Sequence, residues 1–320
     1  MAITLNWANK NANVTNFKVY RGTTKSNLVL LTTLSSSATS YTDNTAQNNT
    51  LYYYQVNVVL GASDEVPGAI TPHTAFTDTG PGPQTLLAGT MEWGYFGQLT
   101  PAEFIPDAQY KALSTTGTAY GTAITLWCKF AYKGKILFVA DNPCRNQTIA
   151  PYTFAKSLYN EGVYLGTGDS SLPHSLLGVG AAAVPQTKRT TAGSYEFIVR
   201  AMKANETTLP SANGLYNSAT PPNQRESVFS EATLIASGSS AWASTAAYVA
   251  QGLMPTKLVG SGALLGVYQN SWHITQHFTS ASNYALMMVN NGTATTSVTG
   301  MAYGTSIACV FLPVLELVTP

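Results

Sequence analysis

Charged residues are scarce in this sequence. Asp, Glu, Lys and Arg make up 10% of its 320 residues, and 16 basic residues nearly balance 15 acidic ones, whereas a typical domain is about 25% charged. This composition excludes a basic footprint for nucleic acid and a charged interaction tail. The polar residues are mainly Ser, Thr, Asn and Gln. Such a surface has little self-repulsion, which suits a subunit that sits among many neighbours in an assembly.

Cysteine is also rare, with Cys128, Cys144 and Cys309 widely separated along the chain. An odd number at such spacing fits neither a disulfide framework nor a zinc-binding pattern. We therefore expect three small buried side chains in a chain that folds in a reducing compartment. Long apolar runs and a secretory signal are absent too, so we expect no transmembrane helix and no membrane partner.

Alternation of apolar and polar residues is strong over the first 60 residues and predicts half-buried β-strands. In ITLNW, Ile3 and Leu5 lie on one face. In LYYYQVNVVL, Tyr52 and Tyr54 share a face with aliphatic residues, and Tyr53 lies on the other face. We therefore expect Tyr52 and Tyr54 in a hydrophobic core and Tyr53 pointing outward.

Four segments together resemble a fibronectin type III domain, an Ig-like β-sandwich. They are LNW, FKVYRG (17–22), SYTD (40–43) and YYYQVNVV (52–59). The resemblance covers residues 1–76 and implies that the Tyr52 ring packs in the core while its hydroxyl bonds to a nearby backbone group.

The resemblance also implies an open sheet edge at the start of this region. A complete domain has a further strand before LNW, and here Met1 lies two residues from the ITLNW strand. Open edges recruit partners, so we expect another subunit or a later segment to cover this one. Ile3 and Leu5, together with the outward Tyr53, are therefore the candidate interface residues.

A stretch rich in Gly and Pro, residues 77–90, separates this region from the rest of the chain and is predicted to be a linker. Residues 91–320 form a larger region dominated by strand patterns. ITLWCKF and KILFVA are typical of a hairpin, and PYTFAKSLYNEG (151–162) is typical of a helix, with Pro in its first turn and Gly at its end. Further strands are expected at 195–204, 262–278, 283–289 and 306–318.

Over residues 91–318, short motifs follow an order that resembles virion structural proteins of tailed bacteriophages. These motifs are a W-x-K-F strand at 127–130, a G-K-x-L-x-V-A hairpin arm at 134–140, a turn with Pro143 and Arg145, and a closing P-V-L-E-L strand at 313–317. The resemblance implies a structural component of a phage particle, such as a collar, baseplate, tail fibre or head decoration. It implies homo-oligomers and contacts with other virion proteins, in a protein made in the host cytoplasm and carried in the virion.

The same order of elements distantly resembles C-type-lectin-like domains, which some phage adhesins use. We therefore expect a mainly β chain, with an N-terminal fibronectin III/Ig-like β-sandwich and a larger β-rich C-terminal domain of α+β type, for which a C-type-lectin-like fold is one candidate. A host-surface glycan-binding adhesin, with a surface polysaccharide as partner, is the alternative function. Exposed aromatic residues such as Trp272 would stack on its sugars, although core packing is the favoured role for most of them.

Two motifs suggest a catalytic or a metal-binding site, but each lacks residues that such a site would need. GDSSL at 168–172, with His174 close by, suggests a serine hydrolase, yet such an enzyme would need a downstream Asp-x-x-His that this chain lacks, so a turn is favoured. His273 and His277 share a face on a helix or a strand, which makes them a weak candidate for metal binding. No Cys, Asp or Glu lies nearby to complete that site, so surface histidines are favoured.

The sequence has no P-loop, H-E-x-x-H, G-x-S-x-G or dinucleotide fingerprint, so we expect no enzyme activity and no cofactor. Paired carboxylates for glycoside cleavage are assembled only by folding, and a polysaccharide-degrading enzyme therefore stays as a third hypothesis. The favoured prediction is a phage structural protein that acts through subunit contacts and has neither nucleic acid nor membrane as a partner.

Overall fold

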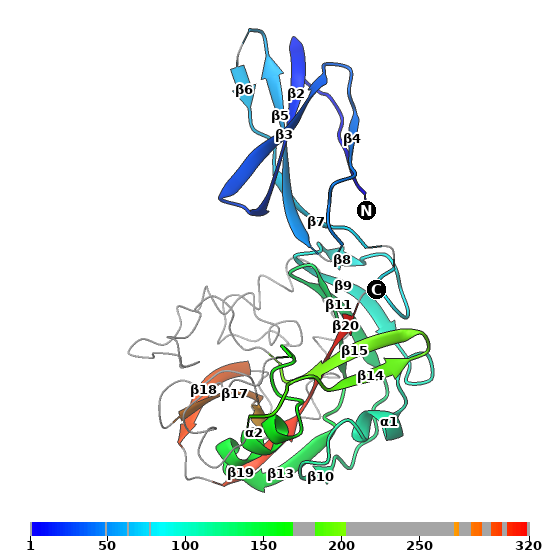
Figure 1. Cartoon of the computed structure of the whole chain (residues 1–320), viewed down its shortest axis with the longest axis vertical. Helices are drawn as coiled ribbons and strands as arrows, with labels where there is room; N and C mark the ends of the chain where they lie inside the picture. Colours follow the sequence, from blue (N-terminus) through cyan, green and yellow to red (C-terminus); the bar gives the residue numbers. More distant parts are fainter. Residues whose placement is uncertain are drawn as a thin grey trace. The chain divides into compact units, whose positions relative to one another are not determined.

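The computed structural model describes residues 2–48, 50–62, 64–76, 78–168, 183–202, 272–274, 283–289, 296–302 and 306–318. The described chain is mainly β, as the alternating patterns predict, and it has two helices, α1 (Asp107–Lys111) and α2 (Pro151–Asn160) (Figure 1). The chain divides into two compact units. The first consists of Met1–Thr79, Thr90–Gly94 and Ala131–Lys135, and the second of Gly80–Gly89, Tyr95–Phe130 and Ile136–Pro320.

The first unit contains two antiparallel sheets, drawn in blue to cyan in Figure 1. β1 and β4 form the smaller sheet, and β3, β2, β5 and β6 form the larger one in that order, with β7 also pairing with β5. The bounds are β1 (Ile3–Asn6), β2 (Val14–Thr24), β3 (Asn27–Ser35), β4 (Ser40–Asp43), β5 (Leu51–Leu60), β6 (Asp64–Val66) and β7 (Ile70–Thr74).

A hydrophobic core joins these two sheets. Ile3 and Leu5 of β1, Val19 of β2, and Tyr52 and Tyr54 of β5 are all buried in it. Residues two apart share one face of a strand, because successive side chains point to opposite faces. The predicted core positions of Tyr52 and Tyr54 are therefore confirmed.

The described part of the second unit contains two further sheets. The seven-stranded sheet has the order β14-β15-β20-β12-β11-β9-β8, and the six-stranded sheet has the order β10-β13-β19-β16-β17-β18. Helix α2 lies against β13 and β19. The bounds are β8 (Ala88–Gly89), β9 (Trp93–Leu99), β10 (Thr118–Ala119), β11 (Trp127–Tyr132), β12 (Lys135–Ala140), β13 (Arg145–Ile149), β14 (Arg189–Ala192), β15 (Tyr195–Arg200), β16 (Trp272–Ile274), β17 (Asn283–Val289), β18 (Thr296–Ala302), β19 (Ile307–Phe311) and β20 (Val314–Val318).

The predicted hairpin and helix are both present. Lys133 and Gly134 join β11 to β12, and their φ angles of 46° and 78° are both positive, as a type I′ turn requires. Helix α2 begins at Pro151, and Gly162 follows its end with a φ of 74°. Glycine takes this conformation readily because it has no Cβ, which is why it commonly follows a helix C-terminus.

The segment predicted as strand at 306–318 forms two strands rather than one, and the second of them is the closing strand predicted at 313–317. The segment forms β19, which pairs with β13, and β20, which pairs with β12 and β15 in the other sheet. Leu312 and Pro313 separate the two strands. Proline has no N–H to donate to a ladder, so the first strand ends here and the chain passes into a different sheet.

Some predicted segments are described only in part. The strand predicted at 195–204 ends at Arg200, and the strand at 283–289 has the predicted bounds. Of the strand predicted at 262–278, the structure describes β16 alone, and residues 169–172 and His174 of the GDSSL motif lie outside the described residues. No helix in the described ranges is long and apolar enough to cross a membrane.

Candidate functional site

The outer edge of β1 presents backbone groups that have no partner strand among the described residues. There, β1 pairs only with β4. Trp7 donates its backbone N–H to Thr39 O at 2.9 Å, and hydrogen-bonded pairs recur at every second residue of an antiparallel ladder. Leu5 therefore bonds toward β4, whereas the N–H and C=O groups of Thr4 and Asn6 point toward the open edge.

A groove of about 380 Å³ lies beside this edge, and we call it the β1 groove. Residues 5–8 line it from the β1 side, Phe17 and Val58 line it from β2 and β5, and residues of β7 line the opposite wall. None of the lining residues is Asp, Glu, Lys or Arg. The Trp7 ring packs on Phe17 with the ring centroids 5.4 Å apart, and the buried Trp7 Nε1–H has no hydrogen-bond partner in the described part of the chain. An unpaired buried donor of this kind is costly to the fold.

His73 of β7 contributes the only imidazole to the lining of the β1 groove. Its ring lies edge-on to Tyr54 with the centroids 5.7 Å apart, and its Nε2 is 3.0 Å from Thr71 Oγ1. Burial lowers the pKa of His73 below its ordinary value of 6.5. The imidazole is therefore neutral at pH 7, and the lining of the groove carries no formal charge.

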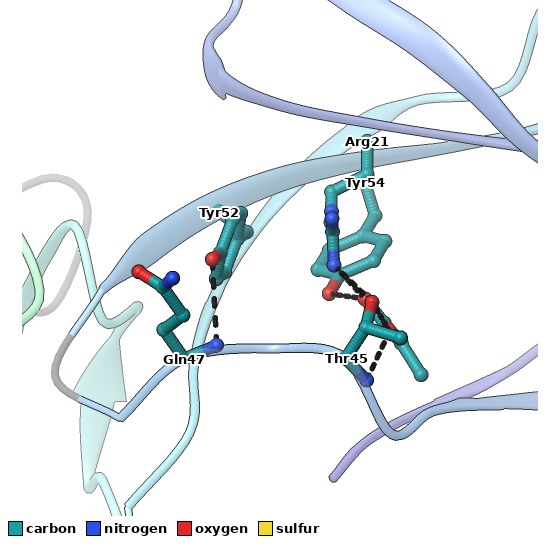
Figure 2. Close-up of polar contacts among 6 residues, drawn as sticks. Arg21, Thr45, Gln47, Tyr52 and Tyr54 are labelled. Carbon is teal, nitrogen blue, oxygen red and sulfur yellow. Dashed lines mark hydrogen bonds and ion pairs between the residues drawn. The ribbon is translucent and has the colours of Figure 1, made fainter. Parts of the chain in front are cut away.

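Asp43 holds β4, the partner of β1, on the larger sheet. Its buried carboxylate accepts hydrogen bonds from Arg21 Nη1 at 2.6 Å, from the Tyr54 hydroxyl at 2.6 Å, and from the N–H and hydroxyl of Thr45 at 2.8 and 2.7 Å (Figure 2). Burial alone would raise the pKa of this carboxyl, but hydrogen bonds from Tyr54, Thr45 and Arg21 outweigh burial and lower the pKa from 3.8 to about 2. Since Arg21 lies on β2 and Tyr54 on β5, one charged group fixes β4, and with it β1.

A second contact in Figure 2 fixes the segment after β4. Gln47 donates its backbone N–H to the Tyr52 hydroxyl at 3.4 Å, and the Arg21 guanidinium lies 4.7 Å from the Tyr52 ring centroid. The expected contact between the Tyr52 hydroxyl and nearby backbone is therefore present. Tyr52 is buried and serves the fold.

The interface candidates Ile3, Leu5 and Tyr53 all have buried side chains. Ile3 and Leu5 are each 5% exposed, so only the backbone edge of their strand is open. The prediction that Tyr53 is free to touch a neighbour is wrong, because Tyr53 is only 8% exposed. Its hydroxyl donates to Glu92 Oε1 at 2.8 Å, the Lys25 ammonium lies 5.3 Å from its ring centroid, and burial raises its pKa. Tyr53 is on the face opposite Tyr52, but side chains remote in sequence cover that face.

Trp272 and His273 lie on β16, where the backbone of His273 pairs with Met287 of β17 and Val310 of β19. Their side chains, and the whole of His277, lie outside the described residues. The prediction that His273 and His277 are surface histidines rather than a metal site therefore stays a prediction, and so does the role of Trp272. Among the described side chains, no group of three His, Cys, Asp or Glu could hold a metal ion.

The three cysteines are buried free thiols, as the sequence predicts. Burial raises the pKa of Cys128 and Cys144, and raises that of Cys309 to about 12. The thiolate is the reactive form of cysteine, so these thiols are inert at neutral pH. They act as small apolar side chains of the core.

Lys129 of the W-x-K-F motif is buried inside the second unit. Its ammonium donates to the backbone carbonyls of Gly80, Pro81 and Pro83 at 3.3, 3.0 and 2.7 Å, and lies 4.9 Å from the Phe96 ring centroid. These contacts fix the Gly/Pro segment that the sequence indicates only as a linker. The pattern of apolar and polar residues along the sequence does not predict this contact, because the donor and its acceptors are nearly 50 residues apart.

Comparisons with known proteins add little to this geometry. No protein-family model matches the chain, and no curated protein matches it. Two crystal structures of pectate lyase Pel3 from Pectobacterium carotovorum match parts of it at 29% and 26% identity, both with a TM-score of 0.22. The matches cover 22% and 28% of this chain, and only 23% and 28% of the pectate lyase chains. A likeness at this TM-score carries no argument about fold or activity.

Proposed function

We propose that this chain is a structural subunit of a tailed-bacteriophage particle and acts through contacts with neighbouring subunits. The open backbone edge of β1 carries the proposal, because unpaired strand edges recruit other chains. The scarcity of charge supports it, since a surface with few like charges packs among neighbours with little repulsion. The motif order in residues 91–318, which resembles virion structural proteins, supports the same class of function.

For the first unit we propose a fibronectin type III-like sandwich whose smaller sheet has two strands, β1 and β4, among the described residues. A two-stranded sheet packed on a larger sheet supports this, as does the hydrogen bond from Gln47 to the core residue Tyr52. In a complete domain of this kind, a further strand pairs with the edge that β1 leaves open here among the described residues. The C-type-lectin-like fold of the second unit stays a prediction from the sequence.

Purified particles of the phage that encodes this chain test the proposed function. We expect quantitative mass spectrometry to find the chain at a constant copy number per particle through successive density-gradient steps. A labelled antibody should then mark one fixed location on the particle in electron micrographs. Infectious particles without the chain, in a host lysate that contains it in free form, would refute a structural role.

A glycan array separates this function from that of an adhesin. A purely structural subunit should bind no host-surface glycan when the purified chain is applied. Glycan binding by a chain that is present in particles would instead add host attachment to the structural role.

A further inference from the structure

We infer that the β1 groove receives a single extended strand from another virion protein, and that this strand is uncharged and carries apolar side chains at alternate positions. The inference deepens the proposed function and rests on it for the source of the strand. Its physical part rests on three observations: the backbone edge of β1, the lining of the groove, and the position of β7.

The backbone edge of β1 favours a polypeptide as the occupant of the groove. Thr4 and Asn6 each direct one N–H and one C=O toward the open side of β1, with the spacing of a β-ladder. An added antiparallel or parallel strand satisfies a row of donors and acceptors at this spacing. A small apolar ligand would leave the row unpaired and so gains less from binding here.

The lining of the groove favours an incoming strand with apolar side chains at alternate positions. A strand that pairs with β1 directs every second side chain into the space between the sheets. There it meets Phe17, Val58 and Leu5, and no charged residue. The Trp7 ring, which packs on Phe17, belongs to the same uncharged lining.

The position of β7 argues against a second copy of this sandwich as the occupant. Thr71 and His73 of β7 line the wall opposite β1, so the larger sheet extends beyond the open edge of the smaller one. A second sandwich that paired its own β1 here would bring its larger sheet against β7. All the described strands of the chain already have places in sheets, so none of them is available as a donor. A single strand on an arm of another protein fits this space.

Hydrogen exchange of the full-length protein, measured by NMR, tests the inference with a defined probe. The probe is a capped peptide of about nine residues in which threonine and valine alternate between terminal lysines, a length within the usual range for strands. We expect the free protein to exchange the Thr4 and Asn6 amides fast and the Leu5 amide, which bonds toward β4, more slowly. Bound peptide should slow the Thr4 and Asn6 amides by at least about tenfold and shift the Trp7 indole signal.

Two variants at one position provide the matched control. Asn6→Pro removes an N–H that points to the open edge, and proline is tolerated on an edge strand when its missing N–H faces solvent. Asn6→Ala keeps that N–H. We expect both variants to retain the thermal midpoint of the wild type, but only Asn6→Ala to bind the peptide. A peptide of the same composition with its valines placed together should not bind.

Four outcomes would overturn the inference. The first is that about 1 mM peptide does not slow exchange of the Thr4 and Asn6 amides, and the second is that Asn6→Pro binds the peptide as well as Asn6→Ala does. The third is that the Thr4 and Asn6 amides of the free protein are already protected in a monomer, and the fourth is that they are protected in a dimer. The third outcome assigns the groove to a segment of the same chain, and the fourth to a second copy. If the peptide does not bind, the chain can still be found in particles and the proposed function stands. If the chain is absent from particles, the proposed function is refuted even if the peptide binds.

Discussion

Replacement of Asp43 by Asn tests whether one buried charge fixes the sheet that presents the open edge. The folded pKa of about 2 lies below the ordinary 3.8, and a tenfold change in an acid dissociation constant corresponds to about 1.4 kcal/mol. The charge therefore contributes about 2 kcal/mol to the stability of the first unit at pH 7. We expect Asp43→Asn to lose about that amount, because the amide keeps the size of the side chain but not its charge-assisted hydrogen bonds.

The pH dependence of this loss follows from the direction of the shift. A carboxyl with a depressed folded pKa contributes fully above its unfolded pKa of 3.8, and its contribution is lost as the pH falls through about 2. The stability difference between wild type and Asp43→Asn should therefore be constant at neutral pH and shrink below pH 3.8. Because two units need not unfold together, exchange of the β5 amides is a better measure than a global melting curve.

Glu65→Gln is the matched control for Asp43→Asn. Hydrogen bonds from Lys18, Tyr20 and Asn57 lower the pKa of Glu65 to about 2 as well. Its side chain is 27% exposed, however, whereas that of Asp43 is fully buried. Solvent screens exposed pairs, so we expect a clearly smaller loss for Glu65→Gln. Equal losses for the two variants, or a loss for Asp43→Asn that persists undiminished at about pH 2, would refute the assignment to burial and charge.

Three further outcomes are expected. Tyr52→Phe removes the acceptor of the Gln47 N–H and should lower the stability of the first unit by about 1 kcal/mol, and unchanged exchange of the β5 amides would show that the contact is dispensable. Lys129→Met removes the ammonium that donates to the carbonyls of Gly80, Pro81 and Pro83 and should make residues 80–83 more sensitive to proteolysis, and an unchanged cleavage rate would contradict this role. The three cysteines should resist a thiol reagent at about pH 8 until denaturant is added, because buried thiols do not ionise there. Rapid labelling of the native protein would contradict their burial.

Strand positions and much of the core of the first unit follow from local pattern alone. Ile3 and Leu5, and likewise Tyr52 and Tyr54, are two residues apart, and a strand places such residues on one face whatever the tertiary context. Glycine and proline mark breaks for equally local reasons. Pro313 ends a strand because it has no N–H, although the continuous apolar pattern around it predicts a single strand.

Contacts between remote residues are what local pattern misses. Tyr53 occupies an outward position of its strand, and it is buried because Lys25 and Glu92 cover it. The β1 groove depends in the same way on His73 of β7, more than 60 residues after β1. An alternating pattern predicts which face a side chain occupies, but not what lies opposite that face.

The remaining edges of the first unit show why β1 is the one suited to an incoming strand. Native sheets protect their edges with charged residues, proline, inward-pointing charge or irregular pairing. Here β6 carries Asp64 and Glu65, β7 carries Pro72, β4 carries the buried charge of Asp43, and the pairing of β3 with β2 has register shifts. The ITLN sequence of β1 has none of these devices. An edge left unprotected in a unit that protects its others is expected to be covered in the assembled state, and the uncharged lining of the β1 groove indicates that an apolar strand covers it.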